Sequence, residues 1–128
     1  MLLTSLYIAE TSNKGRGVFT DKPIEAGSII EIAPVIVLNT KDAKLAHETA
    51  LFYYTFLWGK SKRKAAIALG YGSIYNHSFS PNCVYETYYD ERVMHFVTLR
   101  DIEAGEELTI NYNHDPNNQT PLWFNTKK

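Results

Sequence analysis

The densest group of chemically capable side chains is the stretch YNHSFSPNC, from Tyr75 to Cys83. Asn76 carries an amide that can both donate and accept hydrogen bonds, and His77 can do either through its ring nitrogens. The stretch before it, AAIALGYGSI, is strongly apolar. Such side chains either bond backbone groups in a buried turn or hold a polar ligand, and the residues alone leave both interpretations open.

The same stretch raises the question of nucleophilic or metal chemistry. Cys83 is the only cysteine, and together with His77 it could form an activated nucleophile. No G-x-S-x-G or cysteine-protease motif surrounds the pair, so we do not favour this interpretation. A single cysteine excludes an internal disulfide and a multi-cysteine zinc site. The four histidines are scattered without ligand spacing, so the sequence predicts no metal site.

Two glycine-containing motifs lie on either side of this stretch. In NKGRGVF, Gly15 and Gly17 enclose Arg16, and glycine lets a backbone turn sharply or approach a ligand closely. No helix follows, so the motif is not a dinucleotide-binding fingerprint, and a plain turn is the simpler interpretation. In GEELTINY, residues 105–112, Tyr112 closes an expected strand. A tyrosine in that position is most often a residue at the edge of the core.

Composition limits the classes of protein to consider. The chain has 128 residues, of which 45% are hydrophobic and 21% charged, values that suit one folded domain. The formal net charge of −1 implies no bulk attraction to nucleic acid or to an anionic membrane. No basic residue precedes Lys14, which makes a poor signal peptide, and no apolar run is long enough to span a bilayer. We expect an intracellular, cytoplasmic protein.

Strand-forming segments dominate the chain. Strands are expected at residues 5–10, 17–20, 28–38 and 107–112, with a hairpin over 83–99 that turns at Asp-Glu-Arg. Residues 65–72 are expected to form a strand or a buried extended segment. Pro34 is expected to split its segment into two strands or to form a bulge. Residues 40–59 are expected to begin as a helix capped by Thr40 and to end in an aromatic loop.

Turns and domain organisation complete this picture. The sequence IEAG occurs twice, and Gly27 and Gly105 are expected at turn positions with positive φ. Residues 60–64, KSKRK, form a basic turn. No linker or low-complexity segment divides the chain. We therefore expect a single domain over residues 1–128, mainly β, built from small sheets with little helix.

Taken in order, the G-x-G motif, GYGSIYNHSFSPNC and RDIEAGEELTINY resemble the SET domain of protein lysine methyltransferases. The resemblance covers about residues 5 to 124 and is most specific in the second and third motifs. It implies a β-clip fold whose C-terminal segment threads under an earlier loop, close to a knot. It also implies a core over about residues 5–112 and a tail, 113–128, that completes the pocket.

Domains of this family bind S-adenosyl-L-methionine on one face and a lysine-bearing protein or peptide on the other, and they release S-adenosyl-L-homocysteine. A narrow channel joins the two sites. By resemblance, the cofactor-binding residues are Lys14, Gly15, Arg16, Gly17, Tyr54, Asn76, His77, Tyr112 and Trp123. Tyr53 is the alternative to Tyr54, because the register of LFYYTF is open. Trp123 would cover the adenine ring.

The catalytic residues implied by the resemblance are Tyr112 and Tyr85. Tyr112 would orient the lysine amine, and the channel would supply alignment. Burial and a nearby sulfonium cation both disfavour the ammonium form, so no strong protein base is required. Tyr85 would bond the amine, and Ile110 stands where relatives place an aromatic residue that sets the number of methyl groups. These positions predict mainly mono-methylation.

Some properties follow from how this chain departs from the family. Its tail has no cysteine, so we expect no zinc cluster, as in small stand-alone viral and bacterial members. No flanking domain would direct substrate choice, and the location would be nuclear if the substrate were a histone. A homodimer would help to shield the pocket. The alternative to an enzyme is a non-catalytic binding module on the same fold.

Overall fold

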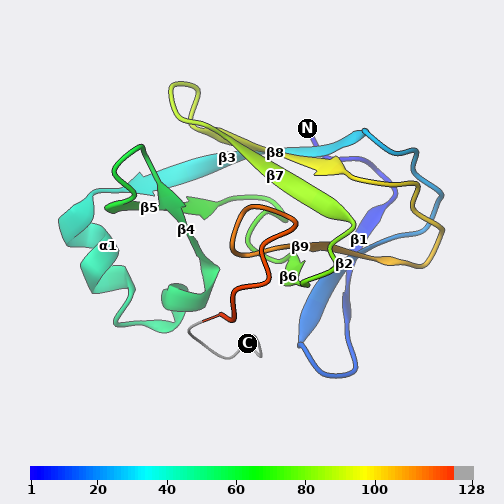
Figure 1. Cartoon of the computed structure of the whole chain (residues 1–128), viewed down its shortest axis with the longest axis horizontal. Coiled ribbons are helices and arrows are strands. Elements are labelled where there is room, and N and C mark those ends of the chain that lie inside the picture. The colour runs from blue at the N-terminus through cyan, green and yellow to red at the C-terminus, as the bar shows by residue number, and fades with distance from the viewer. Residues whose placement is uncertain (123–128) are drawn as a thin grey trace.

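The computed structural model describes residues 1–122, which form two curled β-sheets with little helix, as expected (Figure 1). The strands are β1 (Leu6–Glu10), β2 (Arg16–Thr20), β3 (Ile29–Leu38), β4 (Thr55–Trp58), β5 (Lys64–Ala68), β6 (Asn76–His77), β7 (Cys83–Tyr88), β8 (Val93–Thr98) and β9 (Glu107–Ile110). The helical segments are α1 (Thr40–Ala46) and the 3₁₀ turn η1 (Ala50–Tyr54).

The larger sheet has the strand order β4-β5-β3-β8-β7, and all its neighbours are antiparallel. The long strand β3 pairs with β8 as far as Pro34 and with β5 from Val35 onward. The expected split at Pro34 is therefore wrong, because its missing N–H points to the side on which β5 has already ended. The irregularity lies instead between Ile29 and Glu31.

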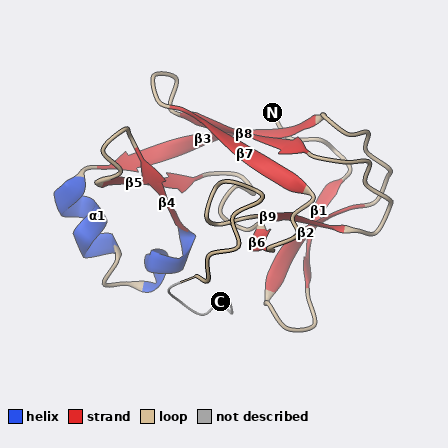
Figure 2. Ribbon diagram, viewed as in Figure 1, coloured by secondary structure: helices blue, strands red, loops and turns tan. Residues whose placement is uncertain are grey.

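The smaller sheet has the order β1-β2-β9-β6. Its last pair is parallel, and places Asn76 opposite Thr109 and His77 opposite Ile110. Figure 2 shows β6 and β9 near the middle of the molecule, between the larger sheet and the β1–β2 hairpin. Two motifs that are far apart in the sequence therefore become direct neighbours.

The helical segment differs from the expectation in two respects. Asn39, not Thr40, caps α1: its side chain accepts a hydrogen bond from the Asp42 N–H at 2.8 Å. Asn39 has the extended backbone that a cap requires, whereas Thr40 is already helical. The aromatic segment that follows is also not a loop, because Thr55–Trp58 form β4 on the edge of the larger sheet.

The expected turns are present. Residues 83–99 form the hairpin β7–β8, with Arg92 at a φ of 56° in its turn. Gly27 and Gly105 have φ values of 77° and 88°, which confirms their left-handed conformation. In the described residues, no helix is long and apolar enough to cross a membrane.

The core joins the two sheets. Ile30, Met94 and Phe96 come from the larger sheet, Leu108 and Ile110 come from β9, and all five are fully buried. Strand β9 thus anchors the residues that follow it against both sheets. Two long-range pairings and a buried core fix the start of the segment that carries Tyr112.

Candidate functional site

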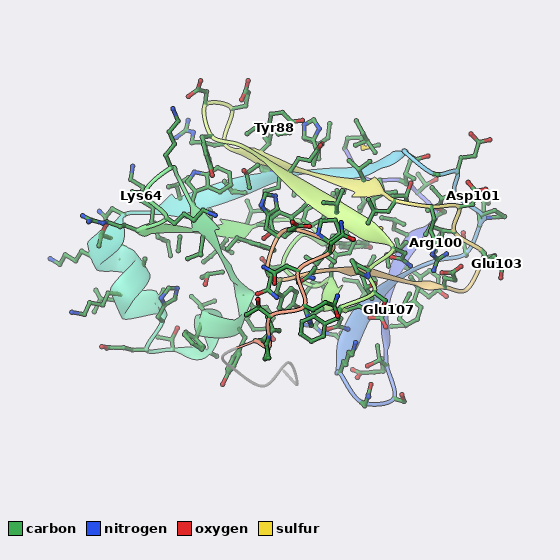
Figure 3. The ribbon with its side chains drawn as sticks, viewed as in Figure 1. Lys64, Tyr88, Arg100, Asp101, Glu103 and Glu107 are labelled. Carbon is green, nitrogen blue, oxygen red and sulfur yellow. The ribbon has the colours of Figure 1, made fainter. Side chains whose placement is uncertain are left out.

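Asn76 links the three sequence motifs. Its side chain is 1% exposed. The Nδ2 atom donates to the carbonyl oxygen of Arg16 at 3.0 Å and to Oε2 of Glu107 at 2.8 Å. One amide therefore joins the G-x-G segment to the start of β9. Figure 3 shows Glu107 beside the β1–β2 hairpin, whereas Asp101 and Glu103 lie farther out, at one end of the molecule.

The two glycines of the G-x-G motif are needed for different reasons. Gly15 has a φ of 71°, which a side chain disfavours. Gly17 lies so close to the Asn76 amide and the Glu107 carboxylate that a Cβ atom would collide with both. Gly15 therefore permits a turn, and Gly17 permits close packing.

His77 is bonded on both its ring and its backbone. Its Nδ1 atom accepts a hydrogen bond from the Tyr112 N–H at 3.0 Å, and its carbonyl oxygen accepts one from Lys14 Nζ at 2.8 Å. Burial, and secondarily the Lys14 charge, lower the pKa of His77 from 6.5 to about 4. The ring is therefore neutral near pH 7 and holds the backbone of Tyr112.

Tyr112 is fixed at its other end as well. Its hydroxyl donates to the carbonyl oxygen of Tyr75 at 2.8 Å. Burial raises the pKa of Tyr112, and the charges of Tyr54 and Glu107 add to the effect. The hydroxyl therefore stays protonated and acts as a hydrogen-bonding group, not as a base.

Tyr75 is held in turn by a buried carboxyl group. The Tyr75 hydroxyl donates to Oε1 of Glu31 at 2.7 Å, and the Tyr71 N–H donates to Oε2 at 2.9 Å. Burial raises the pKa of Glu31, although both hydrogen bonds oppose that shift. Tyr75, whose carbonyl oxygen accepts the hydrogen bond from the Tyr112 hydroxyl, is thus itself held in place by its buried hydrogen bond to Glu31.

Two cavities lie on this framework. The larger, of about 320 Å³, is walled mainly by aromatic side chains, including Tyr54, Tyr85 and Tyr112. The smaller, of about 230 Å³, is lined by Glu10, Gly15, Arg16, Tyr54 and Ile74. Tyr54 lines both cavities. The structure therefore places the G-x-G segment on one side of Tyr54, and Tyr85 and Tyr112 on the other.

Several predicted residues are placed differently. Tyr53 lines the larger cavity but not the smaller, so Tyr54 fits the shared position better. Ile110 is fully buried in the core and lines neither cavity. Trp123 lies outside the described residues. Cys83 is fully buried, and burial raises its pKa to about 12, which argues against the nucleophile interpretation.

Three site residues were not predicted from the sequence. Glu107 opens β9, and nothing in GEELTINY indicates that its carboxylate accepts a hydrogen bond from Asn76, which is 31 residues away. Glu31 gave no local signal, because its partners lie about 40 residues away. His114 follows Tyr112 by two residues and lines the larger cavity.

In the described residues, no group of three or more His, Cys, Asp or Glu side chains could hold a metal ion.

Two cavities that share the lining residue Tyr54, beside a short parallel strand pair, agree with the SET-domain fold expected from the sequence. The model of the SET domain family matches residues 15–113, and the chain belongs to this family. The chain is 35% identical over 125 residues to the histone-lysine N-methyltransferase, H3 lysine-37 specific, of Schizosaccharomyces pombe. The alignment covers 97% of this chain and 80% of that protein.

Two further similar proteins support the same family assignment. The chain is 30% identical over 119 residues to the histone-lysine N-methyltransferase, H3 lysine-36 specific, of Chaetomium globosum, covering 87% of this chain and 13% of that protein. A crystal structure of a Plasmodium falciparum protein, described as a candidate histone methyltransferase, matches with a TM-score of 0.66 at 29% identity. That match covers 89% of this chain and 97% of that one. The chain is thus a protein-lysine methyltransferase of the SET class.

The residues beside the smaller cavity fit S-adenosylmethionine, the methyl donor that SET methyltransferases use. Oδ1 of Asn76 and Nε2 of His77 are buried and have no hydrogen-bond partner among the described residues. Buried polar atoms are rarely left unpaired. S-adenosylmethionine has an ammonium group, a carboxylate and an adenine ring, which offer hydrogen-bonding groups complementary to both atoms.

Proposed function

We propose that this chain transfers one methyl group from S-adenosylmethionine to the side-chain amine of a lysine in a protein. The observation that carries the proposal is the pair of cavities that share Tyr54, with Tyr112 on the wall of the larger. The cofactor supplies a methyl group activated on a sulfonium sulfur. The protein has to hold that group and the amine in line.

Cofactor binding is assigned to the smaller cavity and the residues behind it. Gly15 and Arg16 line the cavity, and Lys14 and Gly17 flank them in the chain. The buried Asn76 and His77 would supply an unpaired acceptor and an unpaired donor. The other positions assigned by resemblance are Tyr54, Tyr112 and, outside the described residues, Trp123. Their role is supported by two geometric facts: Asn76 bonds the Arg16 carbonyl, and Gly17 leaves no room for a side chain there.

Lysine binding is assigned to the larger cavity. The Tyr112 hydroxyl is held by the Tyr75 carbonyl and would face the amine as an oriented dipole. The walls include Phe56 and Tyr89, and an amine buried among them loses hydration, which disfavours its ammonium form. An amine that enters this cavity is therefore driven toward its neutral, nucleophilic form.

Mono-methylation is proposed from Tyr85. This residue is 6% exposed, lines the larger cavity and packs its ring against Phe56 at 5.1 Å. Burial raises its pKa, so its hydroxyl is a neutral group that occupies space near the amine. Tyr85→Phe should add di-methylated product, because one oxygen is removed from the wall. Mass spectrometry of the product tests this, and abundant tri-methylation by the parent protein would contradict the proposal.

The substrate is proposed to be a histone, because two of the relatives are named for lysines of histone H3. The experiment is an assay with labelled S-adenosylmethionine and recombinant histone H3, followed by mapping of the modified lysine. A cell lysate in place of histone H3 separates a wrong substrate from an absent activity. The alternative, a non-catalytic binding module, predicts no transfer to either and little cofactor uptake in calorimetry.

A further inference from the structure

His114 contributes to the wall of the larger cavity, and the proposed function gives it no role. It is exposed, and it lines this cavity together with Tyr85 and Tyr112. Its φ of 75° is unusual for a residue with a side chain. Its backbone N–H donates to the Asn111 carbonyl at 2.9 Å. The turn that carries His114 is therefore closed by a backbone hydrogen bond and has a left-handed conformation at this residue.

The contacts of His114 with Tyr85 determine which ring nitrogen carries the proton. The two rings stack with centroids 4.7 Å apart and an interplanar angle of 28°. The Nε2 atom lies 3.1 Å from the carbonyl oxygen of Tyr85. Because a carbonyl oxygen can only accept, Nε2 must donate. In the neutral ring, Nδ1 is then the nitrogen with a free lone pair.

The other groups that line this cavity are poor proton acceptors. In the described part of the chain, no Asp or Glu lines it. Burial raises the pKa values of Tyr75, Tyr85 and Tyr112, so these hydroxyls remain protonated. Lys62 has no acceptor atom when charged.

The second histidine of the cavity, His47, is engaged elsewhere. Its Nε2 atom lies 3.1 Å from Oγ1 of Thr55, and its ring packs edge-on against Phe52 at 5.5 Å. It thus belongs to the α1–β4 side of the cavity, whereas His114 stacks on Tyr85 and follows Tyr112 in the chain. His114 is therefore the proton acceptor beside the two tyrosines.

We propose that His114 is a catalytic residue that accepts a proton from the ammonium group of the target lysine. This inference rests on the proposed function. A proton passes from the lysine nitrogen to His114, which leaves a neutral amine and an imidazolium ring. The amine lone pair then forms the N–C bond to the methyl group while the C–S bond breaks, and the electron pair of that bond stays on sulfur. Because His114 is exposed, the imidazolium returns its proton to water.

Three proteins test the proposal with histone H3 and labelled S-adenosylmethionine. His114→Phe keeps a ring that can stack on Tyr85 but has no acceptor, and should transfer methyl groups about 10²-fold more slowly. His114→Gly suits the positive φ and leaves space for a free imidazole. Added imidazole should raise its rate in proportion to concentration. His95→Ala, which lies outside the cavity beside Tyr88, should be insensitive to imidazole.

Separate measurements keep this test distinct from that of the proposed function. Calorimetry should give the same cofactor affinity for both His114 variants as for the parent protein. In ¹⁵N NMR spectra of the free parent protein, His114 should show a protonated Nε2 and an unprotonated Nδ1. Parent-level transfer by His114→Phe, no imidazole rescue of His114→Gly, or a proton on Nδ1 would each overturn the proposal. No transfer by the parent protein to histone H3 or to the proteins of a cell lysate would instead refute the proposed function.

Discussion

Tyr112 and Asn76 are positioned in the same way, each by a bond to a main-chain carbonyl oxygen from a distant segment. The Tyr112 hydroxyl bonds the Tyr75 carbonyl, and the Asn76 amide bonds the Arg16 carbonyl. Backbone acceptors inside sheets and their flanking turns cannot rotate away as side chains do. Changes of a few atoms at these two residues should therefore alter binding or chemistry more than the fold.

At Tyr112, removal of the hydroxyl oxygen should reduce the rate of methyl transfer without changing the affinity for the cofactor. Tyr112→Phe keeps the ring, its contact with His77 at 5.2 Å and the backbone bond to His77. It loses the hydroxyl that would orient the amine, so we expect transfer to fall by about 10²-fold. Calorimetry should show an unchanged cofactor affinity. A variant as fast as the parent protein would exclude the role assigned to this hydroxyl.

At Asn76, loss of the amide should weaken cofactor binding. Asn76→Ala leaves the Arg16 carbonyl and the Glu107 carboxylate without their donor, which costs about 1–3 kcal/mol. Asn39→Ala is the matched control, because removing the cap of α1 costs about 1 kcal/mol far from the site. Both variants should melt earlier, but only Asn76→Ala should bind the cofactor less tightly. Equal affinities would contradict the pocket assignment.

Among the elements, the hairpins and turns follow from local sequence. The β7–β8 hairpin and the positive φ of Gly27 and Gly105 depend on residues within a few positions, and the sequence predicts them correctly. The expectations were wrong where a strand distant in sequence determines the local secondary structure. Pro34 is accepted within β3 because of where β5 ends, and residues 55–58 become a strand because β5 lies beside them.

The site could be predicted only through the family resemblance. Composition and spacing left Asn76 open between a turn residue and a ligand-binding residue, and favoured a core-edge position for Tyr112. Their segments lie side by side because β6 and β9 pair in parallel, a contact between strands about 30 residues apart that no local pattern encodes. The roles of Glu107 and His114 could not be predicted for the same reason, since their partners, Asn76 and Tyr85, are distant in sequence.

The contrast between two glycines tests how elements form the pocket. Gly17→Ala adds a Cβ atom against the Asn76 amide and the Glu107 carboxylate, so it should push β2 away from them. Gly27→Ala meets open space but is strained by a φ of 77°. Both should lose about 1 kcal/mol of stability. Only Gly17→Ala should reduce cofactor affinity in calorimetry, and a similar reduction by Gly27→Ala would show that general destabilisation is responsible.

In the whole molecule, the larger cavity exists because a sheet curls until its two edge strands approach each other. The ring centroids of Phe56 in β4 and Tyr85 in β7 lie 5.1 Å apart, and those of Trp58 and Tyr89 lie 5.0 Å apart. These strands lie at opposite edges of the five-stranded sheet. Aromatic pairs across the gap stabilise this closure by about 0.5–1.5 kcal/mol each beyond their buried area. Fold stability and cavity shape are thus coupled.

The buried His77 makes the stability of the whole molecule depend on pH. Its pKa is 6.5 in an unfolded chain and about 4 in the folded one, because burial and Lys14 oppose its charge. Between these values the unfolded state binds the extra proton, so His77 makes stability fall as pH drops from about 6.5 to about 4 and adds nothing above that window.

His77→Gln keeps a side-chain acceptor for the Tyr112 N–H but cannot titrate, so it isolates this effect. Glu31 has a raised pKa and acts with the opposite sign, favouring the folded state as pH falls. The informative quantity is therefore the difference between the two proteins, measured as the free energy of unfolding in urea from pH 7.5 to pH 4. The parent protein should lose more stability than His77→Gln across this range, because only its unfolded state gains a proton at position 77. Parallel curves would mean that His77 is protonated equally in both states, and the buried, neutral imidazole that holds Tyr112 would then be wrong.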